Sequence, residues 1–374
     1  SIRVIFGENT LDQLGDLTKE LGGHRLLVVT DPGIIRAGHV EKALHSLSKV
    51  SIEAFVFDRV EENPTTRHVE EGVRFAHEHQ PIDVIIGLGG GSVMDCAKGI
   101  NFLLTNGGKM EDYWGFGKAT KPMLPSIGIP TTAGTGSEAQ SFALIAQKET
   151  HQKMACGDKK ARFRTVILDP VLLKSVPKKV AAVTGMDAIA HAVESYVTTK
   201  RNAISQMFAR EAWRLLAHNY ETVINEPENI EAWGQMLLGA HFAGTAIENS
   251  MLGAAHACAN PLTAHHGITH GLAVAIMLPH VIEFNSKVVN GYYEELFDTA
   301  VLVRNSKEKS VNQLVEKINE LKTKGGLPER LRDCQVAEEH LPELAKEAAQ
   351  QWTAKFNPRP ISEHDLLHIY RSAY

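Results

Sequence analysis

The sequence predicts an α/β domain over residues 1–178 followed by an all-α domain over residues 179–374. In the first half, short β-branched and apolar runs alternate with amphipathic stretches, which is typical of a parallel sheet with helices on both faces. From about Val180 onward, long stretches have helical periodicity, and no comparable strand candidate occurs. A chain of 374 residues is also long enough for two domains.

Each element follows from its own pattern. Buried strands are predicted at residues 25–31, 52–58, 84–89 and 124–132, with helices between them at 40–49, 65–79 and 92–106. Three short runs are ambiguous strand candidates, at residues 144–147, 153–158 and 165–169. After a break near Pro177, helices are predicted within residues 180–198, 204–224, 230–247, 292–303, 310–324 and 361–374.

Composition excludes several classes of protein. The hydrophobic fraction of 43% and charged fraction of 22% are ordinary for a soluble globular protein. The net charge is -5 and the basic residues are dispersed, so we expect neither a nucleic acid nor a membrane partner. The four cysteines form no CxxC pair, and no signal peptide or membrane-spanning run is visible. We therefore expect a soluble, cytoplasmic protein.

A glycine-rich turn follows the strand predicted at residues 84–89. Gly89, Gly90 and Gly91 allow the backbone to approach a phosphate closely, and the helix that begins behind them favours negative charge. Ser92 is expected to supply an N-cap hydroxyl. The string is neither a clean GxGxxG nor a P-loop, so a tight strand-to-helix turn without a ligand stays an alternative.

Two other segments favour a dinucleotide over a lone phosphate. The loop at residues 130–138 is rich in glycine and small hydroxyl residues that suit pyrophosphate and ribose. Asp31 ends the strand predicted at residues 25–31, where a carboxylate can accept hydrogen bonds from a ribose and repel a 2′-phosphate. NAD is therefore favoured over NADP. N-capping before Pro32 is an equally good role for Asp31.

Asp187 and His191 are the first candidates for metal binding. Their spacing of four residues places both side chains on one face of a helix, one turn apart. Taken alone, such a pair is more often a surface hydrogen bond than a metal site.

A cluster of histidines in an apolar segment supplies further ligands. It comprises His256, His265, His266, His270 and His280. Buried imidazoles need partners or a metal. His256 and His270 are too far apart to share an ion on one straight helix, since 14 residues span roughly 21 Å. Breaks predicted at Asn260-Pro261 and at Gly267 allow two helices to bring both rings together. One carboxylate and three neutral imidazoles suit Fe²⁺ or Zn²⁺.

These segments together resemble the iron-containing, or group III, alcohol dehydrogenase family, whose familiar members include lactaldehyde reductases and 1,3-propanediol dehydrogenases. The resemblance covers essentially the whole chain. It is carried by Gly89 to Ser92 with Asp95 and Lys98, residues 130–138, Leu168-Asp169-Pro170, Gly185 to Asp187 with His191 and Glu194, Gly253 with His256, His270-Gly271, Leu278 to His280, and Asn357 to Arg359.

The resemblance implies a dehydroquinate synthase-like fold, in which a Rossmann-like dinucleotide domain precedes a helical domain that holds the metal and substrate. It assigns the metal to Asp187, His191, His256 and His270. It assigns NAD to Asp31, Asn63, Gly89, Gly90, Gly91, Ser92, Asp95, Thr131, Thr132, Thr135 and Lys153. It also implies a homo-oligomer, a dimer or larger.

One position departs from the family pattern. Members usually carry a further histidine four residues after the first ligand of the second cluster, and this chain has Asn260 there. The resemblance links that histidine to substrate positioning or proton transfer. His266, in the same segment, is a candidate substitute, and an ordinary loop histidine is an equal alternative. Gln140 and Phe142 replace smaller polar residues, so the substrate is expected to differ from simple diols.

The function implied is a metal-dependent, NAD-linked alcohol dehydrogenase or aldehyde reductase acting on a small alcohol or aldehyde. In this hypothesis the metal binds the substrate oxygen and hydride passes between substrate and nicotinamide. Three alternatives stay open: a cofactor-retaining hydroxyacid-oxoacid transhydrogenase, a dehydroquinate synthase-like lyase, and a non-catalytic NAD-binding protein. The lyase needs basic residues to hold a phosphorylated substrate, and few occur around the proposed ligands.

Overall fold

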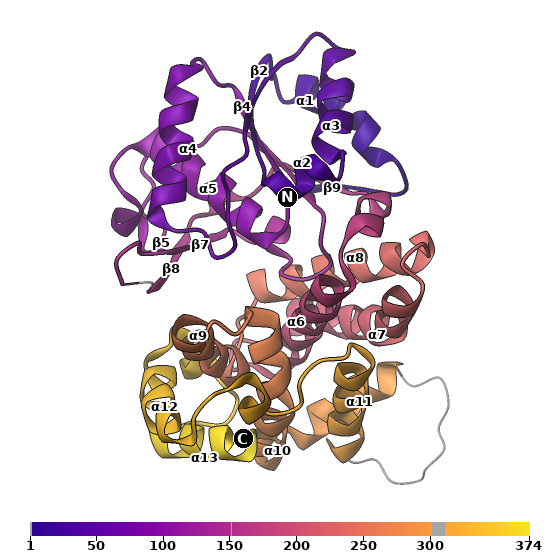
Figure 1. Cartoon of the computed structure of the whole chain (residues 1–374), viewed down its shortest axis with the longest axis vertical. Coiled ribbons are helices and arrows are strands. Elements are labelled where there is room, and N and C mark those ends of the chain that lie inside the picture. Colours follow the sequence, from indigo (N-terminus) through magenta and orange to yellow (C-terminus); the bar gives the residue numbers. More distant parts are fainter. Residues whose placement is uncertain (1, 151, 301–310) are drawn as a thin grey trace. The chain divides into compact units, whose positions relative to one another are not determined.

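The structure is a computed structural model that describes residues 2–150, 152–300 and 311–374. The chain divides into two compact units, shown in Figure 1 with the first unit in indigo to magenta colours. The first unit comprises residues 1–132 and 137–176, and the second comprises residues 133–136 and 177–374. The predicted fold class, a parallel α/β region followed by a helical region, is confirmed.

The first unit contains a six-stranded sheet whose strands are all parallel. Its strands are β1 (Arg3–Phe6), β2 (Arg25–Val29), β3 (Glu53–Phe57), β4 (Val84–Gly89), β6 (Ser126–Pro130) and β9 (Thr165–Leu168). Its α-helices are α1 (Leu14–Glu20), α2 (Pro32–Arg36), α3 (His39–Ser48), α4 (Thr66–Glu78) and α5 (Gly91–Asn106). A smaller sheet contains β5 (Gly115–Phe116), β7 (Phe142–Ala146) and β8 (Lys153–Gly157).

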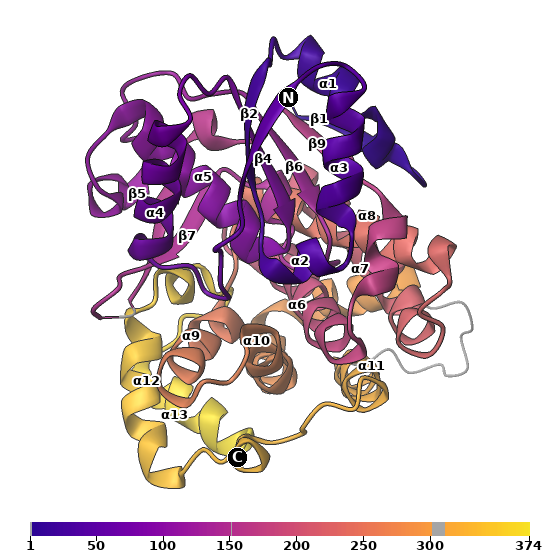
Figure 2. The same cartoon turned by 45° about the horizontal axis from the view of Figure 1, so that its top comes forward.

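Continuous apolar runs explain the central strands of the large sheet. Every residue of β4 and of β6 is buried, as expected when helices cover both faces of a parallel sheet. Helices α4 and α5 lie on one side of this sheet, and α1 and α3 lie on the other (Figures 1 and 2). In α3 and α4, exposed residues recur at helical spacing among buried ones, which is the pattern that predicted these helices. Helix α5 is instead buried from Val93 to Leu103 except at Asp95.

The strand order creates a place for a ligand. The order across the sheet is β1-β9-β6-β4-β2-β3. The chain leaves β2 toward β3 on one side, and it leaves β4 toward β6 on the other side. In open parallel sheets, ligands bind outside the carboxyl ends of the strands at such a reversal. Here it lies between β2 and β4, where Asp31 and the glycine turn follow these strands.

The sequence did not predict the strand β1 or the helix α1. The run is only four residues long, and although Val4, Ile5 and Phe6 are apolar, three of its four residues are exposed. β1 pairs with β9, which is far away in the sequence. The sequence of β1 alone does not reveal this pairing, because an edge strand forms only when a distant strand pairs with it.

Helices and their connecting segments make up the described part of the second unit, which contains no strand. Its α-helices are α6 (Lys178–Val197), α7 (Ala203–Asn225), α8 (Ile230–Glu248), α9 (Ala254–His266), α10 (His270–Ala300), α11 (Val311–Lys324), α12 (Leu341–Gln350) and α13 (Glu363–Ser372). Short 3-10 turns connect the later ones. The helix predicted at residues 292–303 forms the end of α10 as far as Ala300, and its last three residues lie outside the described part of the chain.

One of the two predicted breaks between His256 and His270 is wrong. Pro261 lies inside α9, although a proline in a helix interior removes one backbone hydrogen bond. Packing against α10 and α12 keeps the helix continuous, and the Tyr370 hydroxyl donates to the carbonyl oxygen of Cys258 at 2.7 Å. The break at Gly267 is confirmed, because this residue ends α9 in the left-handed conformation, at φ 63°.

Helix α10 is long and apolar enough to cross a membrane, and no other described helix meets this test. However, 67% of its most apolar window is buried inside the protein. This burial is typical of a core helix.

A buried lysine fastens α5 to the segment that follows β6. Lys98 is 1% exposed. Its Nζ donates to the carbonyl oxygens of Ser137, Gln140 and Phe142 and to the Ser137 hydroxyl, at 2.6–3.1 Å. Asp95 lies 3.7 Å from the same ammonium group and accepts a hydrogen bond from Ser137 Oγ. The Lys98 ammonium group is thus buried among oxygen acceptors that hydrogen-bond to it in place of water.

We therefore expect the substitution Lys98→Met to lower the free energy of unfolding by about 3 kcal/mol, because it leaves buried acceptors without their donor. Urea denaturation of the full chain measures this. The matched control is Lys19→Met, which removes an exposed lysine and should change the free energy by less than about 0.5 kcal/mol. Equal stability of the Lys98→Met variant and the unmodified chain would show that the contacts of this ammonium group contribute nothing.

Candidate metal centre and dinucleotide site

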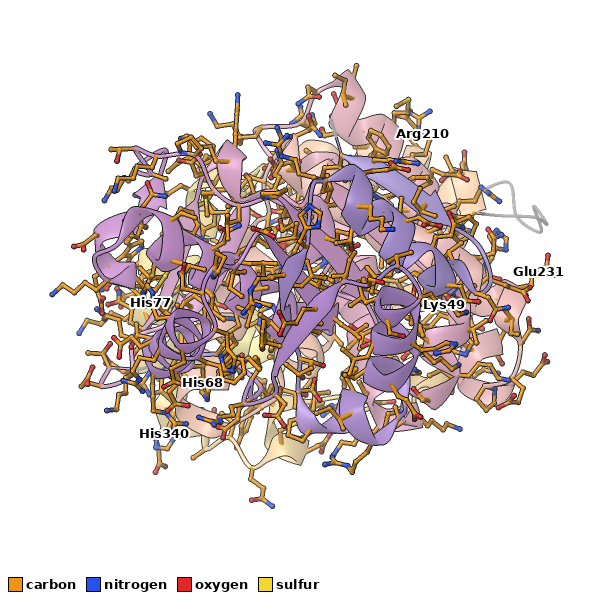
Figure 3. All side chains as sticks on the ribbon, turned by 90° about the horizontal axis from the view of Figure 1, so that it is seen from above. Lys49, His68, His77, Arg210, Glu231 and His340 are labelled. Carbon is orange, nitrogen blue, oxygen red and sulfur yellow. The ribbon has the colours of Figure 1, made fainter. Side chains whose placement is uncertain are left out.

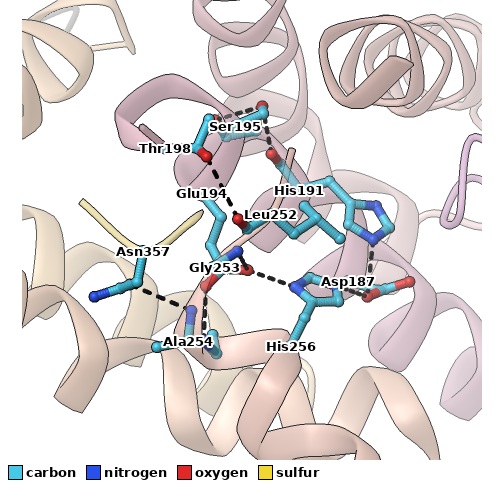
Figure 4. A network of polar contacts seen from close by, with 12 residues as sticks. Asp187, His191, Glu194, Ser195, Thr198, Leu252, Gly253, Ala254, His256 and Asn357 are labelled. Atoms are coloured by element: carbon cyan, nitrogen blue, oxygen red, sulfur yellow. Dashed lines mark hydrogen bonds and ion pairs between the residues drawn. The ribbon is translucent and has the colours of Figure 1, made fainter. Parts of the chain in front are cut away.

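Three helices of the second unit bring four of the predicted residues together. Asp187 and His191 lie one turn apart in the middle of α6, His256 lies in the first turn of α9, and His270 begins α10. Helix α10 packs against both α6 and α9, which places the three segments around one point. Figure 4 shows Asp187, His191 and His256 facing one another.

One carboxylate oxygen is the centre of this cluster. Asp187 Oδ1 lies 3.4 Å from His191 Nε2, 3.4 Å from His256 Nε2 and 3.7 Å from His270 Nε2. The ligand atoms of Asp187, His256 and His270 lie within 4.8 Å of one another. The His191 and His256 rings are stacked, with their centroids 4.8 Å apart. All three histidines therefore present the same ring nitrogen to one oxygen.

These distances fit a shared metal ion better than a hydrogen-bonded cluster. Bonds of 2.0–2.1 Å to a tetrahedral ion place neighbouring ligand atoms about 3.3–3.4 Å apart. The observed separations of 3.4, 3.4 and 3.7 Å are close to this edge length. Neither Asp187 Oδ1 nor His256 Nε2 makes a hydrogen bond, although both are buried. Buried polar atoms seldom lack partners unless something else occupies their lone pairs.

Burial and charge shift the pKa values of the cluster strongly. Burial raises the pKa of Asp187, but the three neighbouring imidazoles outweigh it and hold this pKa well below its usual range. Burial lowers the pKa of His191 to about 4 despite the nearby Asp187 carboxylate. Burial also opposes protonation of His256, but the carboxylates of Asp187 and Glu194 raise its pKa to about 9. The carboxylate is thus ionised and can bind a cation.

Glu194 fixes the orientation of His256 from the opposite side of the ring. Its carboxylate accepts hydrogen bonds from His256 Nδ1 at 2.6 Å, from the amide of Ala255 at 2.7 Å and from the amide of Gly253 at 3.2 Å (Figure 4). Because Nδ1 donates to Glu194, a cation that displaced the second ring proton would find the Nε2 lone pair on the side of Asp187. The same carboxylate caps the amino-terminal end of α9.

A second polar group supports the start of α9. Asn357 Oδ1 accepts from the amide of Ala254 at 3.3 Å and from Asn285 Nδ2 at 3.0 Å. The Asn357 amide in turn donates to Asn285 Oδ1 at 2.7 Å. Arg359 lies over the Phe284 ring at 3.7 Å and donates to its carbonyl oxygen. These contacts join the segment near residue 357 to the start of α9 and to α10.

Glu194 and Asn357 support the start of α9, and the sequence assigns them no role beyond their place in the family motifs. A usable signal existed for Glu194. It lies two helical turns after Asp187 and one after His191, and therefore on the same face of α6. No comparable signal identifies Asn357, because its partners Ala254 and Asn285 are distant in the sequence.

The glycine turn of the first unit lies at the carboxyl end of β4. A side chain at Gly89 would meet Val93 atoms at 2.6 Å, so the turn requires glycine. Gly90 is the N-cap of α5 and no side chain caps this helix, which leaves backbone amides free to bind an anion. The prediction that Ser92 caps the helix is wrong, because its hydroxyl accepts from the Asn63 amide at 3.3 Å instead.

Other predicted cofactor residues follow the neighbouring strands. Asp31 is the N-cap of α2, and its Oδ1 accepts from the amides of Gly33 and Ile34 at 2.7 and 3.1 Å. Thr131 and Thr132 follow β6, beside the glycine turn, and the Thr131 amide donates to the Gly89 carbonyl oxygen at 3.0 Å. The Thr131 hydroxyl is buried without a hydrogen bond. A dinucleotide phosphate or hydroxyl group could satisfy it.

The remaining predicted cofactor residues are placed differently. Asp95 accepts a hydrogen bond from Ser137 at 2.6 Å, and burial raises its pKa. Lys153 begins β8 in the small sheet. Thr135 belongs to the segment 133–136, which groups with the second unit. Asp95 thus lies one turn into the helix that follows the glycine turn, and the nearby Lys153 charge partly offsets the effect of burial on the Asp95 pKa.

The other histidines of the predicted cluster have separate partners. His265 lies 2.8 Å from Glu347, and the His266 ring lies beside that of His340, with centroids 5.2 Å apart. His266 ends α9, ten residues after His256, which corresponds to about 15 Å along a helix. The structure therefore does not bring His266 together with the four clustered residues.

The three positions that depart from the family pattern are also placed. Asn260 lies one turn after His256 on α9, and its Nδ2 donates to Gln351 Oε1 at 2.9 Å. Phe142, in β7, packs against Phe116 with ring centroids 5.6 Å apart. The Gln140 carbonyl oxygen accepts from Lys98. The Asn260 side chain is a neutral carboxamide, which does not act as a general acid or base near neutral pH.

Comparison with known proteins agrees with these features. Residues 1–170 match the family described as Iron-containing alcohol dehydrogenase, and residues 181–374 match the one described as Fe-containing alcohol dehydrogenase family, C-terminal. The chain is 34% identical to 1,3-propanediol dehydrogenase of Klebsiella pneumoniae, over 99% of this chain and 96% of the relative. It is 30% identical to lactaldehyde reductase of Escherichia coli strain K12, over 99% and 97% of the two chains.

Solved structures extend the similarity to the fold. A crystal structure of 1,3-propanediol oxidoreductase matches with a TM-score of 0.96 and 33% identity, over 100% of this chain and 98% of the other. Sulfoacetaldehyde reductase from Bifidobacterium kashiwanohense, solved in complex with NAD+, matches with a TM-score of 0.90 and 26% identity, over 100% and 96%. Both halves of the sequence, the fold and the clustered residues lead to one conclusion: this chain is an oxidoreductase of the iron-containing alcohol dehydrogenase family.

Proposed function

We propose that this protein transfers hydride between NAD and a small alcohol or aldehyde, with a divalent metal ion held by Asp187, His191, His256 and His270. One observation carries the proposal: three imidazole Nε2 atoms surround a single oxygen of Asp187 at 3.4–3.7 Å. With a divalent ion, one carboxylate and three neutral imidazoles leave a net charge of about +1. This ligand set suits Fe²⁺ or Zn²⁺.

When bound, the ion would polarise the substrate oxygen, and the nicotinamide would accept or donate the hydride. The chain's own residues supply orientation. Asp187 contributes the negative charge of the ligand set, and Glu194 holds the Nδ1 hydrogen of His256. Rigid support of this kind keeps the ligand atoms in place before the ion binds.

The reversal of strand order supports a dinucleotide on the first unit. We propose that the residues that contact NAD are Asp31, Asn63, the turn from Gly89 to Ser92, Asp95, Thr131, Thr132, Thr135 and Lys153. The uncapped end of α5 suits the pyrophosphate. Asp31 Oδ1 is used for capping, so the other oxygen is the one expected to accept from a ribose. Its charge would repel the 2′-phosphate of NADP.

The substrate class follows from relatives and from the residues near His256. The relatives named above act, by their names, on propanediol, lactaldehyde and sulfoacetaldehyde, which supports a small alcohol or aldehyde. Asn260 holds a neutral amide one turn from His256. We therefore propose that it binds a substrate polar group rather than carrying a proton. The contact of His266 with His340 gives no support to His266 as a proton carrier.

We further propose that the dinucleotide domain ends near residue 178 and that the metal-binding and substrate domain begins at residue 179. A cytoplasmic homo-oligomer, a dimer or larger, is the proposed form of the protein. Analytical ultracentrifugation of the full chain measures the oligomeric state directly.

The proposed chemistry predicts metal-dependent turnover. The full chain, loaded with Fe²⁺ under anaerobic conditions or with Zn²⁺, should reduce NAD with alcohols from a panel that includes methanol and 1,3-propanediol. Because Asp187 is the only carboxylate among the four ligands, Asp187→Asn should lower the rate by roughly 10³-fold and weaken binding of Zn²⁺. Absorbance of NADH and equilibrium dialysis measure the two effects. The control is Asp16→Asn, which changes an exposed carboxylate in α1.

Several outcomes would contradict this function. Turnover by protein treated with a metal chelator would show that the metal is not needed. Undiminished turnover by the Asp187→Asn variant would show that the Asp187 carboxylate is not needed. Binding of NAD and metal without turnover on any alcohol or aldehyde would favour a non-catalytic binding protein. Tightly retained NAD that turns over only with a hydroxy acid and an oxo acid together would favour a transhydrogenase.

Glu194 should act on metal affinity through His256. In Glu194→Gln, one oxygen replaces two, and the amide NH₂ group faces backbone donors, so the His256 ring loses its fixed orientation. We expect the affinity for Zn²⁺ to fall by roughly 10- to 100-fold, because this is the usual effect of removing a group that hydrogen-bonds a metal-ligating histidine. Competition with a chromophoric chelator measures the affinity, and the visible spectrum of the Co²⁺-loaded protein reports the ligand geometry.

The matched control is Glu231→Gln on α8, because Figure 3 shows the Glu231 side chain at the periphery, and it is exposed. This variant should bind Zn²⁺ as tightly as the unmodified chain. Thermal unfolding of the metal-free variants separates loss of fold from loss of ligand orientation. A folded Glu194→Gln variant with unchanged affinity and an unchanged Co²⁺ spectrum would show that Glu194 has only a structural role.

A further inference from the structure

A polar cavity of about 530 Å³ lies in the second unit, away from the residues of the metal cluster, none of which lines it. Its walls come from α10, α11, residues 329–332 and the carboxyl-terminal end of the chain after Arg371. The volume is within the range of about 300–1,000 Å³ that small-molecule sites occupy in proteins.

Positive charge predominates in the walls. The lining includes four basic side chains, Lys322, Arg330, Arg332 and Arg371, and two carboxylate side chains, Glu283 and Glu329. The whole chain, by contrast, has a net charge of -5. A cation cluster in an acidic protein concentrates anions locally, because low-dielectric walls strengthen its field.

Lys322 is the buried member of this cluster. The residue is only 3% exposed. Its ammonium group has three hydrogens to donate, and its one hydrogen bond within the described residues goes to the Glu329 carbonyl oxygen at 3.3 Å. No carboxylate of the described chain lies within ion-pair distance of it. A buried ammonium ion is costly without compensating charge, and an apolar residue would pack α11 at lower cost.

The three arginines of the cavity are also available. Although Glu283 and Glu329 line the same cavity, none of Arg330, Arg332 and Arg371 forms an ion pair with another side chain of residues 2–150, 152–300 or 311–374. Guanidinium groups bind phosphate and carboxylate oxygens through paired hydrogen bonds. His280 adds a ring nitrogen donor from α10. Four basic side chains and one imidazole thus line a cavity that has only two carboxylate side chains.

We propose that this cavity binds a small oxyanion with two or more negative charges, either a phosphate ester or a polycarboxylate. The anion supplies the acceptors that Lys322 and the arginines lack. The site is separate from the metal cluster and does not depend on the proposed dehydrogenase chemistry. A structural role for Lys322, which ties α11 to Glu329, is the competing explanation.

The test is binding of pyrophosphate and of citrate to the metal-free full chain, measured by isothermal titration calorimetry. The metal-free protein is used because both anions chelate metal ions. We expect Lys322→Gln and Arg371→Gln each to weaken binding about tenfold or more, which is the usual effect of losing a hydrogen bond to a charged group. Arg371 is exposed, so its variant should fold even if Lys322→Gln does not.

The matched control is Lys324→Gln, because Lys324 lies two residues along α11 but pairs with Glu221 and is not part of the cavity lining. It should change the dissociation constant less than twofold. Binding of pyrophosphate alone would identify a phosphate site, and binding of citrate alone would identify a carboxylate site. If neither anion binds at millimolar concentration, or if the cavity variants bind as tightly as the control, the proposal is wrong.

Discussion

The attraction between one buried carboxylate and three imidazoles is the constraint on which the helical unit depends. Asp187 is 4% exposed, and a buried negative charge is unfavourable unless neighbouring groups compensate it. His191 comes from the same helix, but His256 and His270 come from the first turns of α9 and α10. The packing of three helices is therefore tied to the geometry of one oxygen atom.

Two carboxylates of α6 act on the same imidazole in different ways. Glu194 Oε2 lies 2.6 Å from Nδ1 of His256, and Asp187 Oδ1 lies 3.4 Å from its Nε2. The short contact is a hydrogen bond that sets the tautomer, and the longer one has the length expected between two ligands of one ion. Because the two acids are two turns apart on one face, a single rigid helix positions both.

Much of the fold could be predicted from the sequence because its signals are local. Every residue of β4 and β6 is buried, and all of them except Ser126 are apolar or glycine. Gly267 ends α9 as its conformational freedom allows. The failures occur where a distant partner decides. β1 is a strand because β9 pairs with it, and α9 continues through Pro261 because α10 and α12 pack around it.

The sequence by itself determined the kinds of ligand and their spacing along each helix: an acid and an imidazole four residues apart, and two more imidazoles on either side of a glycine. Helical periodicity is a local property, so spacing alone establishes which side chains share a face. Only the tertiary structure decided that these faces meet at Asp187 Oδ1, that Glu194 and Asn357 support the start of α9, and that Lys322 lies among arginines in a cavity. Such contacts join residues far apart in the chain, and they arise from how whole helices pack.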